Sequence, residues 1–132
     1  MNILVCDDDK EIVRAIGIYL KNEGYRVLEA YDGIEALDIL RKEEIHLIIM
    51  DIMMPRMNGL DATRAIRAMK RRDARVIPII AMSANAFADD IINGRLAGMN
   101  RHLAKPVDEE GMIRALRECM SENDVLKLSD EL

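Results

Sequence analysis

The chain has 132 residues, which suits one domain that buries roughly two-thirds of the surface exposed by its unfolded form. Half of the residues are hydrophobic and 33% are charged, as in soluble globular proteins. The net charge of −5 and the pI of about 5.1 argue against a general affinity for nucleic acid or anionic membranes, because like charges repel.

Short apolar runs alternate with amphipathic segments five times along the chain. The expected strands are Ile3–Cys6, Arg26–Ala30, Leu47–Met50, Ile77–Met82 and Arg101–Ala104. The expected helices lie around Ile12–Leu20, Asp32–Leu40, Asn58–Met69 and Phe87–Ala97, and from about Asp108 onward. This alternation predicts an α/β domain with a parallel sheet and helices on both faces.

The composition of the strands predicts their places in the sheet. The first, third and fourth runs are almost entirely apolar, as in central strands that are buried on both faces. The fifth is interrupted by Arg101 and His102 and suits an edge. We expect one domain over residues 1–121, followed by a polar, irregular tail or linker stub over residues 122–132.

Polar residues follow four of the expected strands. The first strand ends in Asp7-Asp8-Asp9, the third in Asp51, the fourth in Ser83 and the fifth in Lys105. Ligands of open α/β sheets bind beyond the carboxyl ends of the strands, so these side chains should meet in one cleft. Asp9 is better explained as a helix N-cap.

Carboxylates that share a cleft repel one another. Two of them about 4 Å apart cost about 4 kcal/mol at an effective dielectric constant of about 20. Mg²⁺ would relieve this repulsion and tolerates a site made of carboxylates, water and phosphate. A carboxylate nucleophile, a metal, the Lys105 ammonium and the Ser83 hydroxyl together favour phosphoryl transfer.

The combined motifs resemble the receiver domain of bacterial two-component systems, over residues 2 to about 120. They are Asp7-Asp8, the run from Asp51 to Gly59 (DIMMPRMNG), Ala81-Met82-Ser83-Ala84 and Ala104-Lys105-Pro106. The resemblance implies a flavodoxin-like (βα)5 fold, with a doubly wound five-stranded parallel sheet in the order 2-1-3-4-5.

The resemblance also implies roles for individual residues. Asp51 would be the phosphoacceptor. Asp8, Asp51 and the Met53 backbone carbonyl would bind Mg²⁺, and Asp7 would contribute through water. Ser83 and Lys105 would contact the phosphoryl group, and the Lys105–Pro106 bond should be cis.

One position departs from the family pattern. His102 stands where receivers often carry Tyr or Phe. If Ser83 moves toward a phosphoryl group, the His102 ring can fill the vacated space, and its protonation would oppose burial. An exposed residue on an edge strand is the alternative for His102.

These features predict a phosphorylation-controlled switch that receives its phosphoryl group from a histidine kinase or phosphotransfer domain. Phosphorylation would change the surface of the fourth helix, fifth strand and fifth helix. We expect no enzyme activity beyond the chain's own phosphorylation and dephosphorylation, no direct nucleic-acid or membrane binding, and a monomer or weak dimer. We expect a cytoplasmic location, because no signal peptide or membrane-length apolar run is present and Cys6 and Cys119 form no metal or redox motif. The receiver could be stand-alone or excised from a larger protein.

Three alternatives concern the site and the surface. A Mg²⁺-dependent phosphatase usually carries a second acid two residues after its nucleophile, where this chain has Met53. A receiver that binds partners without phosphorylation would not need the residues retained here. A basic stretch is expected to be a solvated face, with a kinase-docking or acidic-partner patch as the alternative; it comprises Arg64, Arg67, Lys70, Arg71, Arg72 and Arg75.

Overall fold

The computed structural model describes residues 1–84 and 88–131, with side chains for residues 1–84 and 89–121. The strands are β1 (Asn2–Cys6), β2 (Arg26–Ala30), β3 (Leu47–Asp51), β4 (Ile79–Ser83) and β5 (Arg101–Ala104). The helices are α1 (Lys10–Asn22), α2 (Gly33–Lys42), α3 (Gly59–Arg67), α4 (Ala88–Ala97) and α5 (Glu109–Glu131). None of the helices in the described residues is both long and apolar enough to cross a membrane.

The five strands form one parallel sheet in the order β2-β1-β3-β4-β5, so the predicted fold is confirmed. Every residue of β3 and β4 is buried, whereas β5 lies at the edge and is partly exposed. The parallel order places the carboxyl ends of β1, β3, β4 and β5 along the same edge of the sheet. Those are the strands whose ends carry the candidate site residues.

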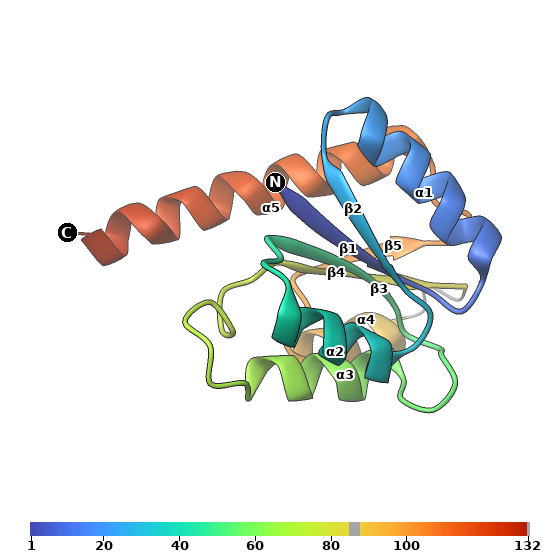
Figure 1. Cartoon of the computed structure of the whole chain (residues 1–132), viewed down its shortest axis with the longest axis horizontal. Coiled ribbons are helices and arrows are strands. Elements are labelled where there is room, and N and C mark those ends of the chain that lie inside the picture. The colour runs from blue at the N-terminus through green and yellow to red at the C-terminus, as the bar shows by residue number, and fades with distance from the viewer. Residues whose placement is uncertain (85–87, 132) are drawn as a thin grey trace.

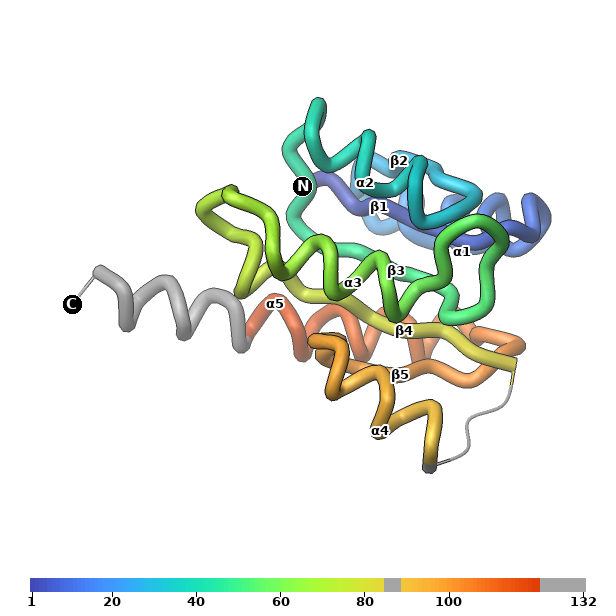
Figure 2. Tube along the Cα trace, turned by 90° about the horizontal axis from the view of Figure 1, so that it is seen from below, coloured from blue at the N-terminus to red at the C-terminus, as the bar shows by residue number. Residues whose placement is uncertain are grey.

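Helices cover both faces of the sheet (Figure 1). One face is covered by α1 and α5, and the other by α2, α3 and α4, which lie nearest the viewer in Figure 2. The first core includes Val13 and Leu20 of α1 with Leu116 of α5, and the second includes Leu37 of α2 with Ile66 of α3. The helical stripes seen in the sequence therefore bury both sides of the sheet.

Side-chain caps fix where the first three helices begin. Asp9 accepts hydrogen bonds from the amides of Glu11 and Ile12, at 3.0 and 3.4 Å, and is the N-cap of α1. Asp32 caps α2, and Asn58 caps α3. Asp9 and Asp32 closely follow β1 and β2, so these two caps also determine the short loops after those strands.

Four expected bounds differ from the structure or are not tested by it. β4 begins at Ile79 rather than Ile77, because Pro78 between them has no backbone N–H to donate to the sheet. The expected irregular tail was wrong: α5 continues to Glu131, and residues 121–131 contain neither Gly nor Pro to stop a helix. The domain boundary at residue 121 stays a prediction. The expected start of the fourth helix near Phe87 lies outside the described residues.

Candidate functional site

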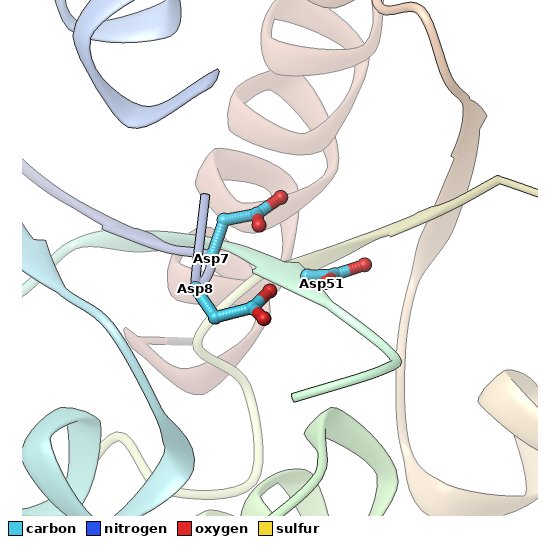
Figure 3. A group of neighbouring side chains, drawn as sticks. All are labelled: Asp7, Asp8 and Asp51. Carbon is cyan, nitrogen blue, oxygen red and sulfur yellow. The ribbon is translucent and has the colours of Figure 1, made fainter. Parts of the chain in front are cut away.

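Three aspartates meet at the carboxyl edge of the sheet. Asp7 and Asp8 follow β1, and Asp51 is the last residue of β3 (Figure 3). One carboxylate oxygen from each lies within 4.8 Å of the other two. Asp7 and Asp51 are buried, and Asp8 is exposed. The three acids therefore meet as predicted, and the cluster is open to solvent at Asp8.

Lys105 joins the two buried aspartates. Its Nζ lies 2.8 Å from Asp7 Oδ2 and 3.2 Å from Asp51 Oδ1. Asp7 also accepts a hydrogen bond of 2.9 Å from the Asp9 amide. The Lys105–Pro106 peptide bond is cis, as predicted. One ammonium thus faces two buried carboxylates, and Asp8 adds a third acid beside them.

This excess of acid changes the pKa values of the site. Burial and then the negative charge of Asp7 raise the pKa of Asp51 to about 6, although Lys105 opposes the shift. Burial also raises the pKa of Asp7, again against Lys105. For Lys105, burial lowers the pKa, but the two carboxylates outweigh it and the net shift is upward. The cleft therefore favours an added positive charge.

The donor set fits a hard divalent cation. Mg²⁺ prefers oxygen ligands and retains waters, and the cleft offers three carboxylates of which one is open to solvent. Asp7 Oδ2 is fully buried. It lies in ion-pair distance of the Lys105 ammonium, but it accepts no hydrogen bond from the described residues. Met53 follows Asp51 by two residues and is exposed.

The β3–α3 loop is held in place by neighbouring backbone. A Cβ atom at Gly59 would collide with the carbonyl oxygen of Asp51, so only glycine permits this approach. The Gly33 amide donates a 3.1 Å hydrogen bond to the Met57 carbonyl oxygen. These contacts connect the loop after the phosphoacceptor candidate to the start of α2.

A further contact in this loop was not expected from the sequence. Arg56 has a left-handed backbone with φ 61°, and its guanidinium pairs with the Asp32 carboxylate, with Nε at 2.7 Å. Asp32 therefore caps α2 and also holds the β3–α3 loop. A left-handed Arg is itself not signalled by the sequence, but the preceding Pro55 indicates a turn at this point.

Ser83 and His102 lie in direct contact. Ser83 is buried at the end of β4, and its Oγ lies 2.8 Å from His102 Nε2 on β5. Within the described part of the chain, His102 Nδ1 is buried without a hydrogen-bond partner. Burial lowers the pKa of His102, although Asp90 opposes the shift. The ring therefore contacts Ser83 in this structure, and its movement into space that Ser83 would vacate stays a prediction.

Known proteins are similar to this chain in sequence and in structure. The model of the response regulator receiver domain family matches residues 3–117. The transcriptional regulatory protein CpxR of Escherichia coli K12 is 33% identical over 115 residues, covering 87% of this chain and 47% of that protein. The CAI-1 autoinducer sensor kinase/phosphatase CqsS of Vibrio cholerae is 36% identical over 111 residues, covering 84% of this chain and 16% of that protein. The chain thus spans less than half of either relative.

Two solved structures are similar over nearly their whole length. The receiver domain of sensor histidine kinase PA1611 of Pseudomonas aeruginosa has a TM-score of 0.82 and 37% identity, covering 91% of this chain and 97% of that one. That structure has a magnesium ion coordinated in its active site cleft. The chemotaxis response regulator CheY4 of Vibrio cholerae has a TM-score of 0.83 and 28% identity, covering 89% of this chain and 97% of that one.

Proposed function

The chain belongs to the response regulator receiver domain family, and from this premise we propose that it is a phosphorylation-controlled signalling switch whose phosphoacceptor is Asp51. The observation that carries the proposal is the Lys105 ammonium placed between the buried carboxylates of Asp7 and Asp51. A cation next to a buried carboxylate prepares the site for the charge that a phosphoryl group brings.

In the proposed reaction, a carboxylate oxygen of Asp51 attacks the phosphorus atom of a phosphohistidine on a kinase or phosphotransfer domain. The new bond is P–O, the bond that breaks is P–N, and the imidazole leaves with the electron pair and takes a proton. Lys105 would then face a phosphoryl oxygen, and Ser83, which ends the neighbouring strand β4, would donate a hydrogen bond to another.

A divalent cation belongs to this proposal. Asp8, Asp51 and the Met53 carbonyl would hold Mg²⁺, with Asp7 acting through water. When bound, the ion would neutralise charge on the phosphoryl oxygens. The magnesium ion coordinated in the receiver of PA1611 supports this assignment, as does the acidic cluster of this chain.

The remaining parts of the proposal concern partners and output. We place the chain in the cytoplasm as a monomer or weak dimer that changes its α4–β5–α5 surface on phosphorylation, without binding nucleic acid itself. Its net charge of −5 supports the last point. The chain would act as an enzyme only on its own aspartate. A phosphatase with an aspartyl-phosphate intermediate is less suited, because Met53 is apolar where the second acid would stand.

Phosphorylation provides the test. With Mg²⁺ and acetyl phosphate, the chain should gain one base-labile phosphoryl group, measured by mass spectrometry of the intact protein. Asp51→Asn should gain none. Asp9→Asn is the matched control, because Asp9 lies beside the cluster but caps α1, and it should be labelled like the wild type. Equal labelling of Asp51→Asn would refute the assignment.

Metal affinity should depend unequally on the two aspartates after β1. Asp8→Ala should weaken Mg²⁺ binding more than Asp7→Ala, because Asp8 is exposed whereas Asp7 is already engaged by Lys105 and the Asp9 amide. Calorimetric titration of each variant measures the difference, and circular dichroism checks that both are folded. A larger loss for Asp7→Ala would contradict the proposed ligand roles.

His102 should make the response to phosphorylation depend on pH. Burial lowers the pKa of His102 in the folded protein, so protonation of the imidazole opposes its packing against Ser83. For such a base, stability is complete above the unfolded-state pKa of about 6.5 and declines as pH falls below it. Acid should therefore favour an outward ring.

Amide exchange of α4 and α5, with and without beryllofluoride as a phosphoryl mimic, measures this effect between pH 6 and 8. His102→Phe keeps a ring but removes the titration, and His46→Ala removes the other histidine of the chain. We expect the pH dependence to persist in His46→Ala and to become smaller in His102→Phe, where only the titration of Asp51, with its pKa raised to about 6, remains at the site. A wild type and a His102→Phe variant that respond alike at every pH would exclude His102 from the switch.

A further inference from the structure

The basic stretch between residues 64 and 75 divides into two groups. Three of its cations have internal partners. Arg64 pairs with Asp61 at 2.9 Å. Arg67 donates to the carbonyl oxygens of Gly98 and Ile77, at 2.7 Å each, and thereby ties α3 to the loops beside it. These contacts explain part of the stretch as structure rather than as a binding surface.

Arg71 is the third cation with internal partners. Its guanidinium donates to the Leu40 carbonyl oxygen at 2.6 Å and holds the Asp73 carboxylate through two nitrogens, at 2.6 and 3.1 Å. It therefore joins the C-terminal end of α2 to the loop after α3. The two walls of the space between these segments are fixed relative to each other.

That space is a groove of about 1010 Å³. Leu40, Met69 and Val76 contribute apolar surface to it, and Val76 is 38% exposed. Figure 2 shows the loop between α3 and β4 at the same end of the molecule as the end of α2. This is the edge at which the strands begin, opposite the edge that carries Asp51, so the groove is separate from the proposed phosphorylation site.

The charges that line the groove are unbalanced. Two of its three acids pair with an arginine, Glu43 with Arg26 at 3.8 Å and Asp73 with Arg71 at 2.6 Å. The third, Glu44, lies 3.3 Å from His46 Nε2, and this contact is an ion pair only when the imidazole is protonated. Three of its cations form no ion pair with any acid of the described residues; they are Lys42, Lys70 and Arg72. The groove is therefore a cationic surface on a protein of net charge −5.

We infer that this groove is a docking site for an acidic, amphipathic segment of a partner protein. Carboxylates of such a segment would face Lys42, Lys70 and Arg72, while its apolar side chains would cover Met69 and Val76. A polynucleotide fits less well, because its uniformly charged backbone would also meet Glu43 and Glu44. A small anion fits less well too, since Arg71, the most buried cation of the groove, already pairs with Asp73 and donates to the Leu40 carbonyl oxygen.

The experiment uses the full chain and a fluorescein-labelled synthetic peptide with Glu and Leu at helical spacing, and fluorescence anisotropy reports binding. The double variant Lys70→Glu/Arg72→Glu should bind about tenfold more weakly or worse, as expected when rim charges are reversed. Val76→Ser should also weaken binding, without changing the charge. The control Arg114→Glu/Arg117→Glu makes the same charge change on exposed positions of α5 and should bind like the wild type.

Several results would overturn the inference. They are no binding to the wild type, equal losses in the two double variants, equal binding of a scrambled peptide of the same composition, and tighter binding of a single-stranded oligonucleotide. Thermal unfolding of each variant separates lost binding from lost structure. Because the groove lies away from Asp51, binding should persist in Asp51→Asn, so failure here and failure of the proposed phosphorylation are distinguishable.

Discussion

Replacing Lys105 by methionine is expected to lower the free energy of unfolding by about 3 kcal/mol at pH 7 without divalent cations, because removing one partner of a buried ion pair strands the other charge. Methionine keeps most of the side-chain volume, so the loss is electrostatic. In the variant, Asp7 and Asp51 face each other without the ammonium that lies 2.8 and 3.2 Å from them. Urea unfolding followed by circular dichroism measures the change.

Two controls separate this effect from a general loss of charge. Lys21→Met removes an exposed lysine from α1 and should change stability by less than about 0.5 kcal/mol. Added Mg²⁺ should reduce the difference between Lys105→Met and the wild type, because an ion that binds the folded state stabilises it by mass action. If Lys105→Met is as stable as Lys21→Met, then Lys105 does not balance the acidic cluster.

Much of the site was predictable because it depends on topology alone. In a parallel sheet with this strand order, residues that end β1, β3, β4 and β5 must lie near one another. The apolar runs located those ends to within two residues. Asp7, Asp8, Asp51 and Lys105 therefore came together as expected, with no knowledge of their side-chain conformations.

Contacts that depend on a single rotamer or turn were not predictable. Asp32 was recognised as a helix cap, but its second role required the left-handed backbone at Arg56, which the sequence does not signal. Similarly, the register of β4 and β5 places Ser83 and His102 on neighbouring strands, but not the direction of the imidazole ring. The basic stretch could not be divided into structural and exposed cations, because Arg67 and Arg71 donate to carbonyl oxygens distant in sequence, those of Gly98 after α4 and Leu40 in α2.

Replacing Asp51 by asparagine is expected to do the opposite of Lys105→Met and raise the free energy of unfolding at pH 7 without divalent cations. Burial and Asp7 raise the pKa of Asp51 to about 6 in the folded protein, against about 3.9 in an unfolded chain. A carboxyl whose pKa is raised by folding loses stability as pH rises through the window between these two values. The shift of about two pKa units already includes the opposing effect of Lys105, and it corresponds to an expected gain of roughly 3 kcal/mol.

Urea unfolding between pH 4 and pH 8 tests whether Asp51→Asn raises the free energy of unfolding. The gain of Asp51→Asn over the wild type should be small near pH 4, grow as pH rises toward 6 and then level off. Asp38→Asn, on the exposed face of α2, should stay within about 0.5 kcal/mol of the wild type throughout. A variant less stable than the wild type at pH 7 would mean that Lys105 outweighs the repulsion among the acids. A gain with the expected pH dependence would instead identify the charge excess at Asp51 as the source of the proposed affinity for Mg²⁺, since the cation would relieve the same repulsion.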